Sequence, residues 1–89
     1  MNIYYTTQFK KDYKKLKRQN KDINKLKIVI EKLIAEEDLE INYKDHQLSG
    51  NWQGFRDCHI EPDWILIYKI SVDTLFLERT GSHSELFRT

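Results

Sequence analysis

Three strand-like segments follow one another in the second half of the chain, and they constrain the possible fold more than any other feature. Phe55–Ile60, Trp64–Ile70 and Thr74–Thr80 are rich in β-branched and aromatic residues. The first connection, residues 61–63, contains the chain's only proline at a position that suits a tight turn, and the second connection is residues 71–73. Consecutive strands with such short connections pair antiparallel, so we predict an antiparallel sheet.

The first half of the chain predicts one more strand and two helices. Residues 2–6 are β-branched and aromatic enough for a strand, and Phe9, Tyr13 and Leu16 then recur at helical spacing. Asn20 and Asp22 offer capping oxygens before a second apolar stripe that runs to about residue 36. We therefore predict an α+β fold in which two N-terminal helices pack on one face of the antiparallel sheet, with a short terminal helix over 83–87.

Length and composition limit the class of protein. We expect the 89 residues to form a single domain with one modest core. The one cysteine, Cys58, cannot form an internal disulfide, and no apolar run opens the chain or approaches membrane-spanning length. We expect a soluble, cytoplasmic protein that makes no use of a membrane.

Charge is divided unevenly along the chain. Residues 1–32 hold ten Lys or Arg and three Asp or Glu, a net charge of +7, whereas residues 33–89 hold five and eleven, a net charge of −6. A lysine-rich half is typical of a surface that meets a polyanion such as RNA, or an acidic protein partner. An ordinary solvated helix face has the same composition, so charge alone leaves these interpretations open.

Ionisable and aromatic residues gather in two blocks, 44–64 and 78–87. All three histidines lie there: His46 in the loop before the strands, His59 near a strand end, and His83 at the start of the terminal helix. Asp63 follows the turn after His59, close enough to orient or charge-tune that imidazole. Cys58 alternates to the opposite face of its strand, where we expect core. A normally twisted sheet would bring the histidines to one end of it.

These residue types suit the cleavage of RNA without a metal or other cofactor. The reaction needs a base for the ribose 2′-hydroxyl, an acid for the leaving 5′-oxygen and a cation for the transition state. Histidine, with an unperturbed pKa of about 6.5, can be either base or acid near neutral pH. Arg79 could hold phosphate oxygens bidentately, and Phe87 or Trp64 could stack on an unpaired base.

The runs KDHQLSGNWQGFRDCHIEPDWILIYK and ERTGSHSELF closely resemble the YafQ branch of the RelE-like messenger RNA interferase toxins of bacterial toxin–antitoxin systems. The resemblance covers residues 44–87, and the first 43 residues agree only in kind. It implies a compact βααβββ fold of the microbial-ribonuclease type, ribosome-associated cleavage of mRNA that inhibits translation, and neutralisation by a cognate antitoxin.

The resemblance also implies roles for individual residues. The motif histidines fall on His46, His59 and His83, the acid on Asp63 and the arginine on Arg79. We expect His46 and His83 to form the acid/base pair, with either order possible, His59 and Asp63 to tune the site, and Arg79 to stabilise phosphate. The expected substrate-binding residues are Phe87 and Trp64 at the base, and Lys14, Lys15, Lys17 and Arg18 toward ribosomal 16S RNA.

Two other interpretations are weighed against this one. A zinc site built from His46, His59, His83 and Asp63 is chemically possible, but the spacing lacks the short paired-ligand motif of structural zinc sites, so we expect no metal. The other alternative is a non-catalytic member of the same fold that only binds RNA or an antitoxin. The complete histidine set argues against it.

Overall fold

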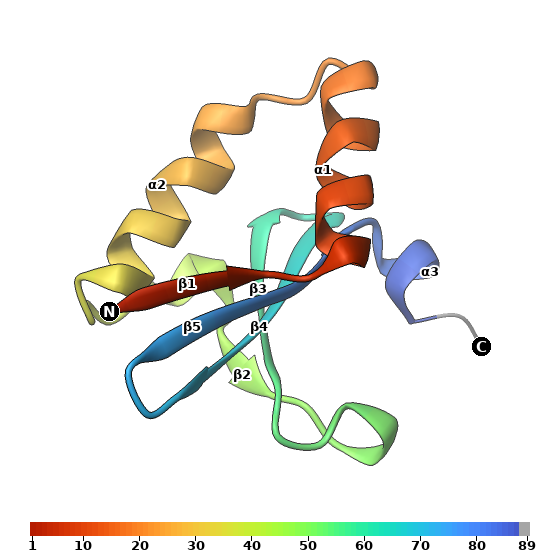
Figure 1. The fold of residues 1–89 in the computed structure, drawn as a ribbon. Coiled ribbons are helices and arrows are strands. Elements are labelled where there is room, and N and C mark those ends of the chain that lie inside the picture. Colours follow the sequence, from red (N-terminus) through yellow and green to blue (C-terminus); the bar gives the residue numbers. More distant parts are fainter. Residues whose placement is uncertain (88–89) are drawn as a thin grey trace.

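The computed structural model describes residues 1–87 and shows the predicted α+β architecture, with two helices on one side of a sheet (Figure 1). The strands and helices follow one another as β1 Asn2–Tyr5, α1 Thr7–Arg18, α2 Ile23–Ile34, the short 3₁₀ helix η1 Ile41–Tyr43, β2 His46–Gln47, η2 Gly50–Trp52, β3 Arg56–Glu61, β4 Trp64–Ser71, β5 Thr74–Gly81 and α3 His83–Leu86. The predicted order of one strand, two helices, three strands and a terminal helix is confirmed. The sequence interpretation missed β2 and both 3₁₀ turns.

The five strands form one sheet in the order β1-β5-β4-β3-β2. Neighbouring strands from β2 to β5 are antiparallel, but β1 pairs with β5 in parallel, with Asn2 opposite Thr74 and Tyr5 opposite Leu77. A wholly antiparallel sheet was therefore wrong at this one edge. The physical reason is the crossover: parallel strands need a long connection, and the chain passes through α1, α2 and the β2–β4 segment before β5 returns beside β1.

Side-chain caps begin both long helices; the Asp22 cap of α2 was predicted, and the Thr6 cap of α1 was not. The Thr6 hydroxyl accepts a hydrogen bond from the Phe9 backbone N–H at 2.9 Å, and the Asp22 carboxylate accepts one from Asn24 at 3.1 Å. The predicted apolar stripes then pack on the sheet. The main core on this face contains Phe9, Leu16, Leu26, Val29 and Leu33 from the helices and Cys58, Trp64, Leu66, Tyr68, Leu75 and Leu77 from the strands.

The opposite face of the sheet carries a second, smaller apolar cluster. Ile65 and Ile67 of β4 alternate away from the helix-covered face and pack with Leu86 of α3. Leu48, Trp52, Phe55 and Phe87 complete the cluster. This second cluster packs α3, which carries His83, and the 48–55 loop against the sheet.

Candidate active site

Strand register brings the functional groups of distant segments into two neighbouring rows. His46, Asp57, Ile67 and Arg79 are consecutive partners across β2, β3, β4 and β5, and residues directly opposite one another share a face of the sheet. The adjacent row runs from His59 through Ile65 to Gly81, and His83 follows two residues later on α3. The histidines therefore meet at one end of the sheet, on the face that α1 and α2 leave uncovered.

Asp57 lies among these histidines and is the residue that the sequence interpretation missed. It is 3% exposed, and one of its carboxylate oxygens, Oδ1, lies 3.0 Å from Nδ1 of His46. Burial raises the pKa of the Asp57 carboxyl, while the charges of His46, His59 and His83 act in the opposite direction. A signal was available, because Asp57 alternates onto the same strand face as His59. Without a tertiary contact, that carboxylate looked like an ordinary polar residue.

His46 is held in one tautomer by its surroundings. Its Nδ1 lies 2.8 Å from the backbone carbonyl oxygen of Lys44 and 3.0 Å from the Asp57 carboxylate. A backbone carbonyl can only accept a hydrogen bond, so Nδ1 carries the proton that is donated to Lys44. The other ring nitrogen, Nε2, then has a free lone pair on a side chain that is 55% exposed. His46 is thus on a strand rather than in a loop, and it presents a proton acceptor to solvent.

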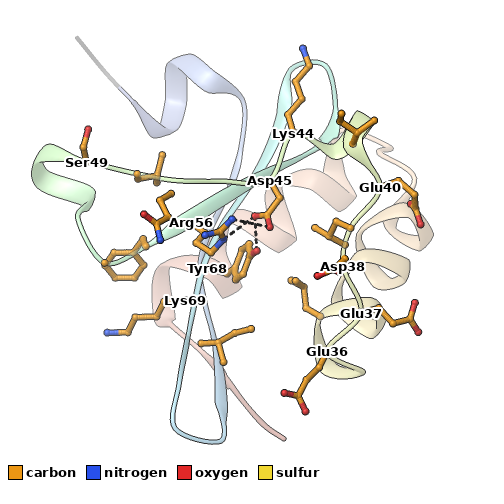
Figure 2. Close-up of a pocket in the computed structure, with 18 of the residues that line it drawn as sticks. Glu36, Glu37, Asp38, Glu40, Lys44, Asp45, Ser49, Arg56, Tyr68 and Lys69 are labelled. Atoms are coloured by element: carbon orange, nitrogen blue, oxygen red, sulfur yellow. Dashed lines mark hydrogen bonds and ion pairs between the residues drawn. The ribbon is translucent and has the colours of Figure 1, made fainter.

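The Asp45 carboxylate anchors the segment that carries His46. It accepts hydrogen bonds from Nε and Nη2 of Arg56 at 3.3 and 3.2 Å, and from the Tyr68 hydroxyl at 2.6 Å (Figure 2). Burial and the hydrogen bond to Asp45 raise the pKa of the Tyr68 hydroxyl, which therefore remains protonated as a donor. Asp45 was also absent from the predicted site, although it directly precedes His46.

A cavity of about 1280 Å³ is bordered by this anchor, and its lining contains none of the histidines. Acidic residues of the 36–40 segment form one wall, and Lys44 and Lys69 lie elsewhere around it (Figure 2). Its role in the site is indirect, since the Asp45–Arg56–Tyr68 network that borders it positions the strand of His46.

Asp63 positions His83 rather than His59. The Asp63 carboxylate accepts a hydrogen bond from the His83 backbone N–H at 3.0 Å, and among residues 1–87 no hydrogen bond joins it to His59. This contact, together with the Ser82–Glu85 capping box, begins helix α3. The His83 ring lies 5.1 Å from the ring of Phe87, which in turn contacts Trp52. The predicted pairing of Asp63 with His59 is therefore replaced by a backbone contact that orients the other histidine.

Arg79 is held by an acid from helix α1. Its Nε and Nη2 donate to the two oxygens of Asp12, each at 3.0 Å, and this contact raises the pKa of the guanidinium. Lys15, one turn further along α1, forms an ion pair with Glu85 of α3 and lowers the pKa of that carboxyl to about 2. Helix α1 therefore contacts both Arg79 and the helix of His83.

Trp64 was expected to stack on an RNA base, and the structure contradicts that expectation. The side chain is 1% exposed, and its indole N–H donates to the Thr80 hydroxyl at 2.9 Å inside the core. An indole enclosed on both faces has no surface for a base. Cys58 is fully buried in the same core, where burial raises the pKa of the thiol, so its predicted structural role is confirmed.

His59 occupies the margin of the site. It is half-buried and lines a small cavity of about 320 Å³ together with Asn42, Lys44 and Pro62. Within residues 1–87 no group of three or more His, Cys, Asp or Glu side chains is arranged to hold a metal ion. No helix of this part of the chain is both long and apolar enough to span a membrane.

The four predicted basic residues of α1, Lys14, Lys15, Lys17 and Arg18, are all exposed. Lys15 is engaged by Glu85, and the Lys17 ammonium lies 5.6 Å from the ring centre of Tyr13. They lie on the helix that also holds Arg79, so a polyanion bound to them would be close to the histidine site.

Sequence and structure comparisons identify the family. A sequence model described as the bacterial toxin of type II toxin–antitoxin systems, YafQ, matches residues 1–88. The chain belongs to the YafQ toxin family. The match extends beyond the 44–87 block that carried the resemblance and includes the lysine-rich half.

Individual relatives agree over nearly their whole length. The chain is 49% identical over 87 residues to the mRNA interferase toxin YafQ of Escherichia coli K12, covering 97% of this chain and 95% of that one. It matches the E. coli DinJ–YafQ complex structure at 49% identity and a TM-score of 0.90, covering 97% of each chain. It also matches a metal-bound toxin from Helicobacter pylori at 44% identity and a TM-score of 0.91, covering 98% of this chain and 99% of that one.

The buried carboxylate of Asp57 makes a prediction about stability. Because burial raises its pKa, the folded protein retains this proton to higher pH than the unfolded chain does, so the free energy of unfolding falls as pH rises from about 4 through the raised value. We expect Asp57→Asn to remove this decrease in the free energy of unfolding. At pH 8 the variant should melt a few degrees above the parent, which corresponds to a gain in the free energy of unfolding on the order of 1 kcal/mol. Melting followed by circular dichroism from pH 4 to 9 measures both effects.

The exposed Asp38→Asn provides the matched control, since it removes the same charge from a solvated position. It should leave the pH profile of the parent unchanged. An Asp57→Asn variant that melts below the parent at pH 8 would contradict the prediction, because it would mean that the ionised carboxylate stabilises the fold.

Proposed function

We propose that this chain is the toxin of a type II toxin–antitoxin pair and an endoribonuclease that cleaves mRNA on the ribosome, in the cytoplasm, by metal-independent acid/base chemistry. Membership of the YafQ family and the 49% identity to an mRNA interferase support the toxin and endoribonuclease assignments. The observation that carries the mechanism is the environment of His46, because it distinguishes a base from an acid among three histidines.

His46 is the general base in this mechanism. With Nδ1 protonated toward the Lys44 carbonyl and beside the Asp57 carboxylate, Nε2 accepts the proton of the ribose 2′-hydroxyl. The imidazolium that forms is stabilised by Asp57, whose negative charge lies 3.0 Å from the ring. The Lys44 carbonyl thus fixes the tautomer that proton abstraction requires, and Asp57 favours the protonated ring that results.

His83 is the general acid. The 2′-oxygen attacks phosphorus, the bond from phosphorus to the 5′-oxygen breaks, and the imidazolium of His83 protonates that leaving oxygen. The products are a 2′,3′-cyclic phosphate and a 5′-hydroxyl. The hydrogen bond between the Asp63 carboxylate and the His83 backbone N–H supports this role, since it fixes the helix end from which the imidazole projects.

The remaining residues bind the substrate. Arg79 stabilises the charge on the phosphate oxygens, and His59 tunes the site from its margin. Phe87 orients a base with its half-buried ring, which is held between Trp52 and His83.

An antitoxin is the proposed protein partner. E. coli YafQ is known in complex with DinJ. In this chain, an apolar groove of about 650 Å³ lies between β1, α1 and α2 and includes Tyr5, Phe9 and Ile30, with Lys10, Lys14 and Lys27 among its lining residues. Apolar surface bordered by lysines favours an acidic amphipathic segment. A small acidic or ribbon-helix-helix protein encoded beside this gene would support the pairing.

Expression of the chain alone should arrest bacterial growth, and His83→Ala should relieve the arrest. Loss of a general acid lowers the rate by about a hundred- to ten-thousand-fold, while the backbone contact to Asp63 is retained. Growth curves and incorporation of labelled amino acid measure the effect. Ser84→Ala, on the same exposed helix turn, is the control that should remain toxic. A folded His83→Ala protein as toxic as the parent would refute the assigned acid.

RNA cleavage should also continue when metal ions are removed by a chelator. Internal attack by a 2′-hydroxyl needs no metal-bound water, so excess EDTA should leave the rate of RNA cleavage within about twofold, and the product should carry a 2′,3′-cyclic phosphate. End-group analysis and gel assays measure both. Activity that is lost with EDTA and restored by zinc would favour a metal mechanism instead. This control matters because the similar toxin from H. pylori was solved with bound metal.

The basic residues of α1 should capture ribosomal RNA without taking part in bond breaking. Each lost phosphate contact should reduce the log–log salt slope of ribosome binding by roughly 0.7 to 0.9. Lys14, Lys17 and Arg18 changed together to glutamine should therefore weaken and flatten binding, while single-turnover cleavage at saturating ribosome stays near the parent rate. We omit Lys15 because its ion pair with Glu85 also supports α3.

The control replaces Lys25, Lys27 and Lys32 of α2 with glutamine, which changes the net charge equally. The ion pairs that it removes, of Lys25 with Glu61 and of Lys32 with Glu40, do not involve α3, and exposed pairs contribute little to stability. Its salt slope should match that of the parent. Equal slopes in the α1 variant and the parent would mean that these residues face solvent or the antitoxin.

A further inference from the structure

Asp12 is a buried acid whose position on helix α1 is not explained by the packing of that helix. It is 7% exposed and lies on the face between the core residues Phe9 and Leu16. An apolar residue would continue this stripe. A carboxylate is tolerated in such a place only when its charge is paired and its oxygens are hydrogen-bonded.

Four hydrogen bonds saturate the Asp12 carboxylate. Arg79 donates from Nε to Oδ2 and from Nη2 to Oδ1, each at 3.0 Å. The Thr80 backbone N–H donates to Oδ2 at 3.2 Å, and Gln8 donates to Oδ1 at 3.2 Å. The pairing of β1 with β5 ends at Tyr5 and Leu77. Beyond this last pair, the Asp12 carboxylate accepts the hydrogen bond of the Thr80 backbone N–H on the edge of β5. Two of the four donors belong to a single guanidinium.

This arrangement leaves the other edge of Arg79 available. A guanidinium has five N–H groups in a rigid plane, and Asp12 engages the Nε/Nη2 edge bidentately. Nη1 and the second proton of Nη2 point away from the carboxylate. The side chain is 26% exposed and lies in the same cross-strand row as Asp57 and His46. Arg79 is therefore fixed along one edge, and among residues 1–87 its other edge makes no side-chain hydrogen bond.

We propose that Asp12 is the positioning residue for Arg79 and holds its guanidinium preset for a phosphate oxygen of the RNA. Asp12 itself does not touch the substrate. Without the carboxylate, the flexible side chain of Arg79 would sample several rotamers, and the cation would have to be ordered at each binding event. This inference rests on the proposed role of Arg79 at the phosphate.

A double-mutant cycle tests the proposal, with full-length protein acting on mRNA-programmed ribosomes. Arg79→Gln should lower kcat/KM at least tenfold, and Asp12→Asn, which retains the side-chain shape, should lower it about tenfold. Because Asp12 acts through Arg79, the double variant should be no less active than Arg79→Gln alone, within about twofold. A purely structural role would instead give multiplied losses.

Asp12→Asn will also weaken the contact to Thr80, so stability must be separated from positioning. Val29→Ala, in the core of α2 and away from the site, lowers the melting temperature and should leave kcat/KM within twofold when assayed well below it. If Arg79→Gln cleaves like the parent, the phosphate role of Arg79 fails, and this inference fails with it. If Arg79→Gln is impaired, the inference alone is overturned in either of two cases: Asp12→Asn matches the parent, or it loses the same factor in both backgrounds.

Discussion

The contact between the buried Asp57 carboxylate and His46 is the interaction on which the candidate site depends. Burial disfavours the charged form of a carboxyl group, and it raises the pKa of Asp57. The charges of three imidazoles, those of His46, His59 and His83, act in the opposite direction. Both the carboxylate and the Lys44 carbonyl lie near Nδ1 of His46 and favour the tautomer that is protonated there. A polar group that costs stability thus defines the chemistry of its neighbour.

The same device recurs around the site. Asp12 holds Arg79, Asp63 holds the backbone of His83, and Asp45 holds the segment before His46 through Arg56 and Tyr68. Each of these carboxylates comes from a different element than the group it orients, or joins elements together. The groups proposed to meet RNA are mostly exposed. The acids behind His46 and Arg79 are buried or half-buried, whereas Asp63, behind His83, is exposed. The orientation of these exposed side chains therefore depends on hydrogen bonds and ion pairs with the carboxylates behind them.

The two apolar clusters explain how so small a chain supports this arrangement. The larger cluster joins α1 and α2 to one face of the sheet, and Trp64 and Cys58 belong to it. The smaller cluster on the other face supports α3 and the loop that carries Trp52. The histidines lie on the side of the smaller cluster, where α1 and α2 do not cover the sheet.

Periodicity predicted most of the fold because it reflects local physics. The stripes of α1 and α2 and the alternation that buries Cys58 follow from side-chain direction alone. The same local patterns could not show that β1 lies parallel to β5, since that pairing depends on how a long crossover returns. Nor did they reveal β2, whose two residues are too few for any period.

For the site, the sequence by itself determined which residue types were available and, through family motifs, that His46, His59, His83 and Arg79 belong together. Only the tertiary structure decided their partners. Asp12 is 67 residues from Arg79, and Asp63 is 20 residues from His83, so neither pairing leaves a local pattern. Trp64 also shows what sequence motifs leave out. Its place in the motif predicted a binding residue, but the packing of the sheet buries it in the core. Hydrogen-bond partners and burial depend on which distant segments pack together, and the spacing of residues along the sequence does not show which segments do.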